Sequence, residues 1–227
     1  MKRSRINQIV SQSISFMEDH SWSLPEWAYW NESDWKKSRS DCQRIFDCQL
    51  GWDITDFGSS DFSKRGLIMF TQRNGGVSNP GKTYAEKIMI VGDSQETPFH
   101  FHWNKMEDII NRGGGKLMFQ LHKATSDEQL SDEAFDVYID DRRYRINGGE
   151  YISLNPGQSL CLETHVYHRF FAEDGDVLCG EVSKVNDDNS DNRFYEDVGR
   201  FPDIEEDEEI GHFLVNDYKQ FQEHGTL

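Results

Sequence analysis

Two histidines separated by one residue are the side chains of this sequence best suited to chemistry. His100 and His102 lie in a run of apolar residues, and on an extended strand both imidazoles would point to the same side. A carboxylate, Glu107, follows within reach of a turn, and a third imidazole, His168, comes from a separate segment. Three neutral imidazoles and one carboxylate suit a divalent first-row ion and leave coordination positions open for water or substrate. The sequence therefore predicts a metal centre built from these four residues.

The elements that would position these side chains begin with a helix. Apolar residues recur on one helical face at Ile6, Ile9, Val10, Ile14 and Met17. This spacing predicts an amphipathic helix over residues 4–19, which ends before Pro25. Ser33 is expected to cap a second, short helix. Residues 1–40 should therefore form an N-terminal helical extension.

Short apolar or alternating runs follow, and each is bounded by glycine, asparagine, aspartate or proline. The runs cover residues 43–55, 66–73, 83–91, 97–103, 116–123, 136–139, 142–146, 151–154, 159–162, 168–172, 177–185 and 213–218. Clear turn signals separate some of them, as at residues 73–76, 111–115 and 147–149. So many short strands predict a mainly β fold, either a sandwich or a closed barrel, with the N-terminal helices packed outside.

The length of the chain favours one domain over residues 1–227, because 227 residues can bury a full core. Within it, residues 43–185 would form the β core and residues 210–227 a C-terminal strand and tail. Residues 186–209 would form a loop that is long for a compact domain. Its aromatic residues favour a packed loop.

Composition narrows the classes of partner and compartment. The formal net charge is −17. Proteins that bind nucleic acids or anionic membrane surfaces do so through clustered lysine and arginine side chains, so neither is expected as a partner. No apolar run approaches the length of a membrane span, and the start of the chain lacks a signal-peptide core. The four cysteines form no C-x-x-C motif, which is typical of reduced thiols. A soluble, cytoplasmic protein is therefore predicted.

The spacing around the histidine pair resembles the first motif of the cupin superfamily. His100-x-His102-x4-Glu107-x6-Gly114 follows the superfamily pattern of His-x-His-x3–4-Glu-x6-Gly. The resemblance covers about residues 90–185. It implies a cupin β-barrel, a double-stranded β-helix of the jelly-roll type.

The second cupin motif is present in altered form. Gly157-x5-Glu163-x-His165-x2-His168 keeps its spacing, with Glu163 and His165 in place of the usual proline and glycine. The resemblance places His168 at the ligand position and His165 at the turn glycine, outside the ligand set.

Nearly the whole chain is similar to the D-lyxose isomerase family of cupins. The segments that carry this resemblance are residues 51–58, 84–91, 100–115, 180–189, 191–194 and 200–202. The resemblance implies a Mn²⁺-dependent aldose–ketose isomerase that forms a homodimer. Its substrates would be D-lyxose and D-xylulose, often also D-mannose and D-fructose.

Isomerisation between C1 and C2 also needs groups that bind the sugar and move a proton. The resemblance implies that Lys87 contacts sugar oxygens, and a lysine within an apolar run is consistent with this. Glu205, Glu206 and Glu181 are candidates for the base, and we expect Glu205 to act as the catalytic carboxylate together with Lys87. Trp103 and Glu181 are expected to bind substrate.

Two other classes of function fit the same metal ligands. An iron-dependent dioxygenase of the cupin superfamily could use them to hold Fe(II). A non-catalytic sugar-binding protein could use the ion only to hold hydroxyl groups.

Overall fold

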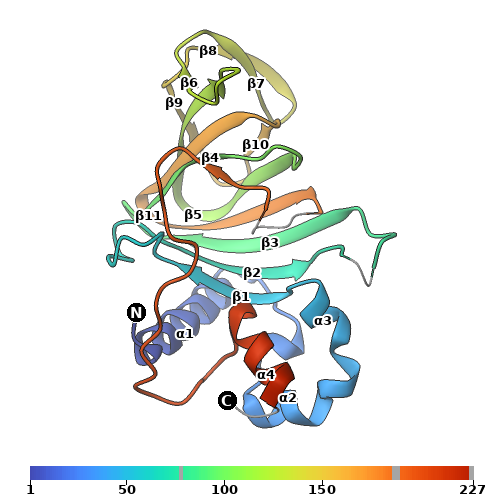
Figure 1. The fold of residues 1–227 in the computed structure, drawn as a ribbon. Coiled ribbons are helices and arrows are strands. Elements are labelled where there is room, and N and C mark those ends of the chain that lie inside the picture. Colours follow the sequence, from blue (N-terminus) through green and yellow to red (C-terminus); the bar gives the residue numbers. More distant parts are fainter. Residues whose placement is uncertain (77–78, 186–189, 225–227) are drawn as a thin grey trace.

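A computed structural model describes residues 1–76, 79–185 and 190–224. The fold is mainly β, as predicted, and its strands form one twelve-stranded sheet of antiparallel pairs (Figure 1). The strands are β1 Gly51–Thr55, β2 Leu67–Arg73, β3 Tyr84–Val91, β4 Glu96–Phe101, β5 Glu107–Ala124, β6 Leu130–Ser131, β7 Phe135–Ile139, β8 Arg142–Ile146, β9 Tyr151–Leu154, β10 Ser159–Leu162, β11 Val166–Lys184 and β12 Arg193–Phe194.

The helices lie on one side of this sheet, next to β1 (Figure 1). They are α1 Arg3–Asp19, η1 Glu26–Tyr29, α2 Glu32–Ser38, η2 Arg39–Asp41, α3 Gln43–Asp47, η3 Val215–Asp217 and α4 Tyr218–His224. The predicted N-terminal helix is confirmed, because α1 buries Ile6, Ile9, Val10 and Met17 against apolar side chains of β1 and β2. The start of the second helix was predicted wrongly. Asn31, not Ser33, caps α2, since its side chain accepts a hydrogen bond from the amide of Asp34.

Two predicted strand segments are helical instead. Residues 43–47 form α3, and the predicted C-terminal strand over residues 213–218 is replaced by η3 and the start of α4. Both segments pack aromatic side chains around Trp35, with Phe46 from α3 and Tyr218 from α4. Tertiary packing of large aromatic rings therefore overrides the local strand pattern in these segments.

Two strands are longer than predicted. β11 replaces the two predicted strands over residues 168–172 and 177–185, and β5 extends the single predicted strand over residues 116–123 back to Glu107. They pair with each other from Val166 opposite Lys123 to Ser183 opposite Glu107. The glycine-rich residues 111–115, predicted as a turn, continue β5 through an irregularity in the pairing. Gly114 has φ +93°, and a Cβ there would lie 2.0 Å from the carbonyl oxygen of Asp176, so only glycine fits at this position.

The sheet order runs β1-β2-β3-β11-β5-β10-β7-β8, while β4 pairs with β11 and β12. Among the described strands, β1 and β8 at the two ends of this path do not pair, so the strands do not form a complete ring. One apolar cluster occupies the space enclosed by the curved sheet, with Phe119, Leu121, Leu154 and Leu160 fully buried. The site described below lies beside this cluster.

The predicted loop over residues 186–209 is described only from residue 190 onward. Residues 190–210, called the late segment below, contain β12, which pairs with β4, and an amide of Gly199 that donates to the carbonyl of Phe57. The late segment then reaches the start of α1 (Figure 1), where Arg3 pairs with Glu206. Of the aromatic residues that favoured a packed loop, Phe194 packs against Phe57 and His100, whereas Tyr195 and Phe201 are exposed. The four residues 186–189 lie outside the described part of the chain.

None of the described helices is both long and apolar enough to cross a membrane.

Candidate metal centre

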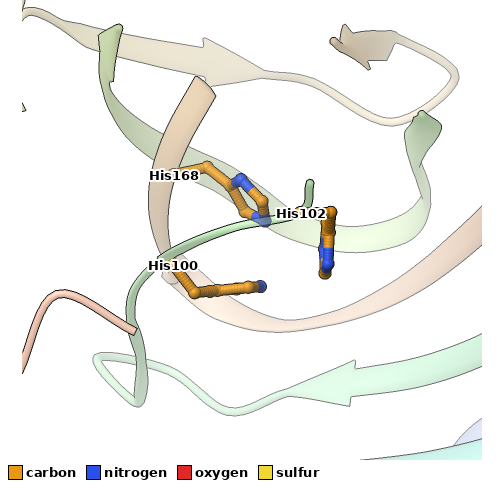
Figure 2. A group of neighbouring side chains, drawn as sticks. All are labelled: His100, His102 and His168. Carbon is orange, nitrogen blue, oxygen red and sulfur yellow. The ribbon is translucent and has the colours of Figure 1, made fainter. Parts of the chain in front are cut away.

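Three histidines meet where β4 and β11 pair. His100 lies on β4, His102 follows the end of that strand, and His168 lies on β11 directly opposite His100. Figure 2 shows the three rings converging on a common point. All three are buried, and one ring nitrogen of each lies within 4.8 Å of the other two. The three sequence-predicted imidazoles are therefore brought together.

Each imidazole is oriented by one backbone carbonyl. The Nδ1 of His100 lies 2.9 Å from the oxygen of Pro98, and the Nδ1 of His168 lies 3.0 Å from the oxygen of Val166. The Nδ1 of His102 lies 2.8 Å from the oxygen of Asp191 in the late segment. Since a carbonyl only accepts hydrogen bonds, each neutral ring must carry its proton on Nδ1. The Nε2 lone pairs then face inward, which is the arrangement that metal-binding histidines require.

The carboxylate of Glu107 faces the same point from the first residue of β5. Its Oε1 lies 3.3 Å from Nε2 of His102 and 3.3 Å from Nε2 of His168. With the protons on Nδ1, an oxygen acceptor here faces two nitrogen acceptors. Among the described residues the buried Nε2 of His102 has no hydrogen-bond partner. A cation would satisfy all of these lone pairs at once, so the residues fit a divalent metal ion.

Burial decides the protonation of this group. Desolvation, with the neighbouring imidazoles adding to it, holds the pKa of His100 well below 6.5. Burial lowers the pKa of His168 to about 4, against the opposing attraction of Glu107. For Glu107, burial would raise the pKa, but the charge of Lys105 and the contact with His102 hold it well below 4.5. At neutral pH His100 and His168 are thus neutral and Glu107 is ionised, which are the forms that bind metal.

A second buried cluster adjoins the histidines. The Nζ of Lys105 lies 2.6 Å from Oε2 of Glu107 and 3.0 Å from Oε1 of Glu181. Lys87 on β3 is the register partner of Glu181 on β11, and its Nζ lies 3.5 Å from Oε1 of Glu181. The hydroxyl of Ser183 donates to the same oxygen over 2.9 Å. Two ammonium groups and a carboxylate are thus held next to the metal-binding nitrogens.

These groups line a cavity of about 50 Å³. Its lining comprises Thr55, Phe57, Leu67, Met69, Lys87, Met89, Thr97, His100, His102, Lys105, Glu107, Ile109, His168, Phe170, Glu181, Asn192, Phe194 and Arg200. The late segment supplies part of one wall, where the ring of Phe194 stacks on His100 with centroids 5.2 Å apart. The cavity combines apolar walls with a few convergent polar groups, as small-molecule sites do.

The other predicted site residues divide into two groups. Lys87 and Glu181 are buried and line the cavity. Trp103 does not line it; its ring packs edge-on against Phe101, and its indole Nε1 donates to Glu128 over 2.9 Å. Glu205 is exposed, and its backbone pairs with Arg3 and Met1 at the start of α1. The predicted roles of Trp103 in substrate binding and of Glu205 in catalysis therefore have no support from their positions.

Two residues of the site were missed in the sequence. Lys105 lies between the histidine pair and Glu107, and a lysine so close to three ligands could have indicated its contact with the carboxylate. Asp191 carried no such signal, since 87 residues separate it from Asn104, to which it is hydrogen-bonded.

Solved structures of two L-ribose isomerases share this fold. The L-ribose isomerase of Cellulomonas parahominis with L-ribose matches 90% of this chain and 98% of its own, with a TM-score of 0.60 at 14% identity. The L-ribose isomerase of Acinetobacter sp. DL28 in complex with L-ribose matches 87% of this chain and 93% of its own, with a TM-score of 0.55 and 14% identity. Fold and site together define a cupin-type protein with a centre of three histidines and one carboxylate.

The sequence identifies the family within this class. The family model described as D-lyxose isomerase matches residues 1–218, and the chain therefore belongs to the D-lyxose isomerase family. The D-lyxose/D-mannose isomerase of Escherichia coli O157:H7 is 46% identical over 98% of this chain and 100% of its own length. The D-lyxose/D-mannose isomerase of Serratia proteamaculans is 45% identical over 97% of this chain and 99% of its own length. The resemblance found in the sequence is confirmed, and the protein is a sugar isomerase.

Proposed function

We propose that this protein is a divalent-metal-dependent aldose–ketose isomerase that interconverts D-lyxose and D-xylulose, and also D-mannose and D-fructose. The observation that carries the metal dependence is the set of inward-facing, unprotonated Nε2 atoms opposite Glu107. The substrates follow from the two relatives named D-lyxose/D-mannose isomerase, which match this chain end to end. Mn²⁺ is the proposed ion, held by His100, His102, Glu107 and His168.

When bound, the ion would supply Lewis-acid chemistry by polarising the carbonyl of the open-chain sugar. The protein must do the rest: a proton leaves C2 of the aldose and arrives at C1 of the ketose, while another moves between their oxygens. A carboxylate that reaches both carbons can carry the first proton. Ammonium groups beside it can donate to the sugar oxygens as negative charge develops on them.

Glu181 is the carboxylate that we assign to the proton transfer. It lines the cavity, is buried, and lies on the strand that also carries His168. Glu107 is a less suitable carrier, since its Oε1 contacts the metal-binding nitrogens. Glu181 thus replaces Glu205, whose exposed position lies away from the cavity. Lys87 and Lys105, both in contact with Glu181, would bind the sugar oxygens.

The test is an isomerase assay with defined metal content. Metal-stripped protein, reloaded with Mn²⁺, would be offered D-lyxose, D-mannose and D-xylulose in turn while the product ketose or aldose is measured. Activity that depends on the added ion is expected with each sugar. No turnover of any of them would refute the proposed function, and tight D-lyxose binding without turnover would point to a sugar-binding protein instead. Oxygen consumption with Fe(II) would point to a dioxygenase.

Glu181→Gln tests the assignment of the base. The amide cannot accept the proton from C2, so kcat should fall by at least about 100-fold, within the range of general base catalysis. Affinity for Mn²⁺ should stay within about twofold of wild type, because Glu181 is not among the proposed ligands. Glu205→Gln is the matched control and should leave kcat unchanged. A large loss with Glu205→Gln and none with Glu181→Gln would reverse the assignment.

We also propose that the protein is a cytoplasmic homodimer. The family resemblance supports the dimer, and three of the cysteines, Cys42, Cys161 and Cys179, are free thiols as a reducing compartment favours. Light scattering of the purified protein measures the assembly directly.

A further inference from the structure

Asp191 makes an unusual set of contacts for a residue outside the metal centre. It lies in the late segment, is buried, and is far in sequence from every group that it contacts at the site. Its side chain and its backbone both reach the stretch of residues 102–105, which joins the histidine pair to Glu107. No part of the proposed reaction uses it.

The carboxylate of Asp191 holds the turn that follows His102. Its Oδ1 accepts from the backbone amide of Asn104 over 2.9 Å and from the Asn104 side-chain amide over 3.0 Å. Its Oδ2 accepts from the backbone amide of Lys105 over 2.9 Å. Each of these bonds is charge-assisted, so the turn is fixed by three of the stronger hydrogen bonds that proteins make.

The carbonyl of the same residue orients a metal-binding ring. It accepts the proton on Nδ1 of His102 over 2.8 Å, and so turns Nε2 of that ring toward the centre. His100 and His168 obtain this orientation from residues two positions away on their own strands. Only His102, among the three, depends on a residue from a distant segment.

We propose that Asp191 is a positioning residue that preorganises the metal centre by fixing both His102 and the turn carrying Lys105. The inference rests on the proposed metal binding but not on the identity of the sugar. Partners that orient metal ligands typically change metal affinity by 10–100-fold when they are removed. A second effect concerns the turn. Lys105 directly follows Asn104, and Glu107 lies three residues after Asn104, so both would lose their fixed approach to the cavity.

The experiment measures Mn²⁺ binding to the metal-stripped full-length protein, by the electron paramagnetic resonance signal of the free ion and without any sugar. Asp191→Ala keeps the backbone carbonyl but removes the three carboxylate bonds that fix this carbonyl against the turn carrying His102 and Lys105. It should raise Kd for Mn²⁺ at least tenfold. Asp191→Asn keeps the size of the side chain, but its one oxygen cannot accept both from Asn104 and from the amide of Lys105 as the two carboxylate oxygens do. It should raise Kd for Mn²⁺ by an intermediate factor. Asp197→Ala, at an exposed aspartate of the same late segment, is the matched control and should stay within twofold of wild type.

Hydrogen exchange separates positioning from general stability. In metal-stripped Asp191→Ala, amides of residues 102–107 should exchange faster, while the paired amides of β5 and β11 away from the site keep their protection. A variant with lower thermal stability but unchanged Kd would show that Asp191 is only structural, and would overturn the proposal. Unchanged Kd together with unchanged exchange would overturn it as well.

Asn104→Ala gives a second line of evidence, and its effect in the wild-type background can be measured even if the Asp191 variants fold poorly. Asn104 is exposed, so the change leaves the core intact, yet it removes one of the three bonds to Asp191. It should raise Kd for Mn²⁺ by a few fold in the wild-type background and have no effect in the Asp191→Ala background, since the two residues act as a unit. Additive effects would contradict the proposal. Wild-type protein that binds Mn²⁺ without isomerising any sugar would refute the proposed function and leave this test valid, whereas wild-type protein that binds no Mn²⁺ would overturn the inference too.

Discussion

At the scale of single residues, the candidate metal centre depends on which ring nitrogens of the three histidines carry the protons. Each imidazole donates from Nδ1 to one carbonyl oxygen, so its other nitrogen is left bare in a buried site. Glu107 then adds a carboxylate to nitrogens that cannot donate to it. This buried group of acceptors is costly on its own, and the proposed ion would offset that cost.

Replacement of His168 by glutamine should weaken Mn²⁺ binding at least tenfold. The change removes one nitrogen ligand, and even partners outside the ligand set commonly affect affinity by that factor. His165→Gln is the matched control, three residues earlier, where the exposed ring stacks on Phe101 instead of facing the centre. Titration of each metal-stripped protein with Mn²⁺ provides the comparison. Equal affinity in the two variants would remove His168 from the ligand set.

The free energy of unfolding of the metal-free protein should fall as the pH drops from 6.5 toward 4. Burial lowers the pKa of His168 to about 4, whereas an imidazole in the unfolded chain keeps a value near 6.5. The unfolded state therefore binds protons more readily in this interval, and the folded state loses roughly 1.4 kcal/mol per pH unit for one such group. The contribution is fully present above pH 6.5. The lowered pKa of Glu107 acts in the same direction below about pH 4.5.

Urea unfolding at several pH values measures this slope. His168→Gln removes one of the titrating groups and should make the slope shallower, with His165→Gln again as the control. A slope unchanged by His168→Gln would show that this imidazole is not the group responsible.

At the scale of elements, β5 and β11 carry the site from two directions. Glu107 begins β5, and His168 and Glu181 lie thirteen residues apart on β11. The bend in this pair of strands occurs where Gly114 opposes Val177, with the pairing irregular between Glu173 and Val177. β11 can therefore line the cavity with His168 on one side of this irregularity and Glu181 on the other, while β5 lines it with Glu107 at its first residue.

Gly114→Ala should destabilise the fold by about 2–4 kcal/mol, from strain at positive φ and from crowding against the backbone. The added Cβ would lie 2.0 Å from the carbonyl oxygen of Asp176, which is too close for any contact. Gly81→Ala is the control, since a Cβ there meets nothing within 4 Å. Thermal or urea unfolding of the two variants would show the difference. A fully stable Gly114→Ala protein would mean that the strands can pair without this irregularity.

The sequence predicted the local parts of this architecture well. The alternation of side chains along a strand predicted that His100 and His102 lie on one face, and the helical spacing of apolar residues predicted α1. Both patterns depend only on residues that are near neighbours in sequence. The glycines at residues 113–115 were wrongly predicted as a turn, since only the partner strand reveals that they continue β5. Asp191 was missed and Glu205 was chosen as base for the same reason. Their positions depend on contacts across 86 residues and more, which no local pattern encodes. Lys105 was missed although its place between the ligands in sequence indicated its contact with Glu107.

At the scale of the whole molecule, the start of the chain fastens the late segment in place. The guanidinium of Arg3 is buried and pairs with Glu206 at 2.7 Å and with Asp217 at 2.9 Å. Ser4 donates to Asp207 next to these contacts. The late segment is thus held at both ends, by β4 near the cavity and by α1 on the opposite side of the sheet (Figure 1).

Arg3→Met should lower the free energy of unfolding by about 3–5 kcal/mol, because Asp217 would stay buried without its counter-charge. Arg5→Met, on the exposed face of the same helix, should change it by less than about 0.5 kcal/mol. Urea unfolding at neutral pH measures both. If the two variants were equally stable, the buried ion pair would contribute nothing measurable.

The pairing of β11 with β3, β4 and β5 also has a consequence for the order of folding. Strand partners so distant along the chain must find one another by slow loop closure, and sheets of this kind fold in milliseconds to seconds. His100 and His168 come into register only when β4 joins β11, across more than sixty residues. The three nitrogens therefore have no common geometry in a partly folded chain. The proposed binding of an ion would therefore come at the end of folding, and it could not guide the earlier steps.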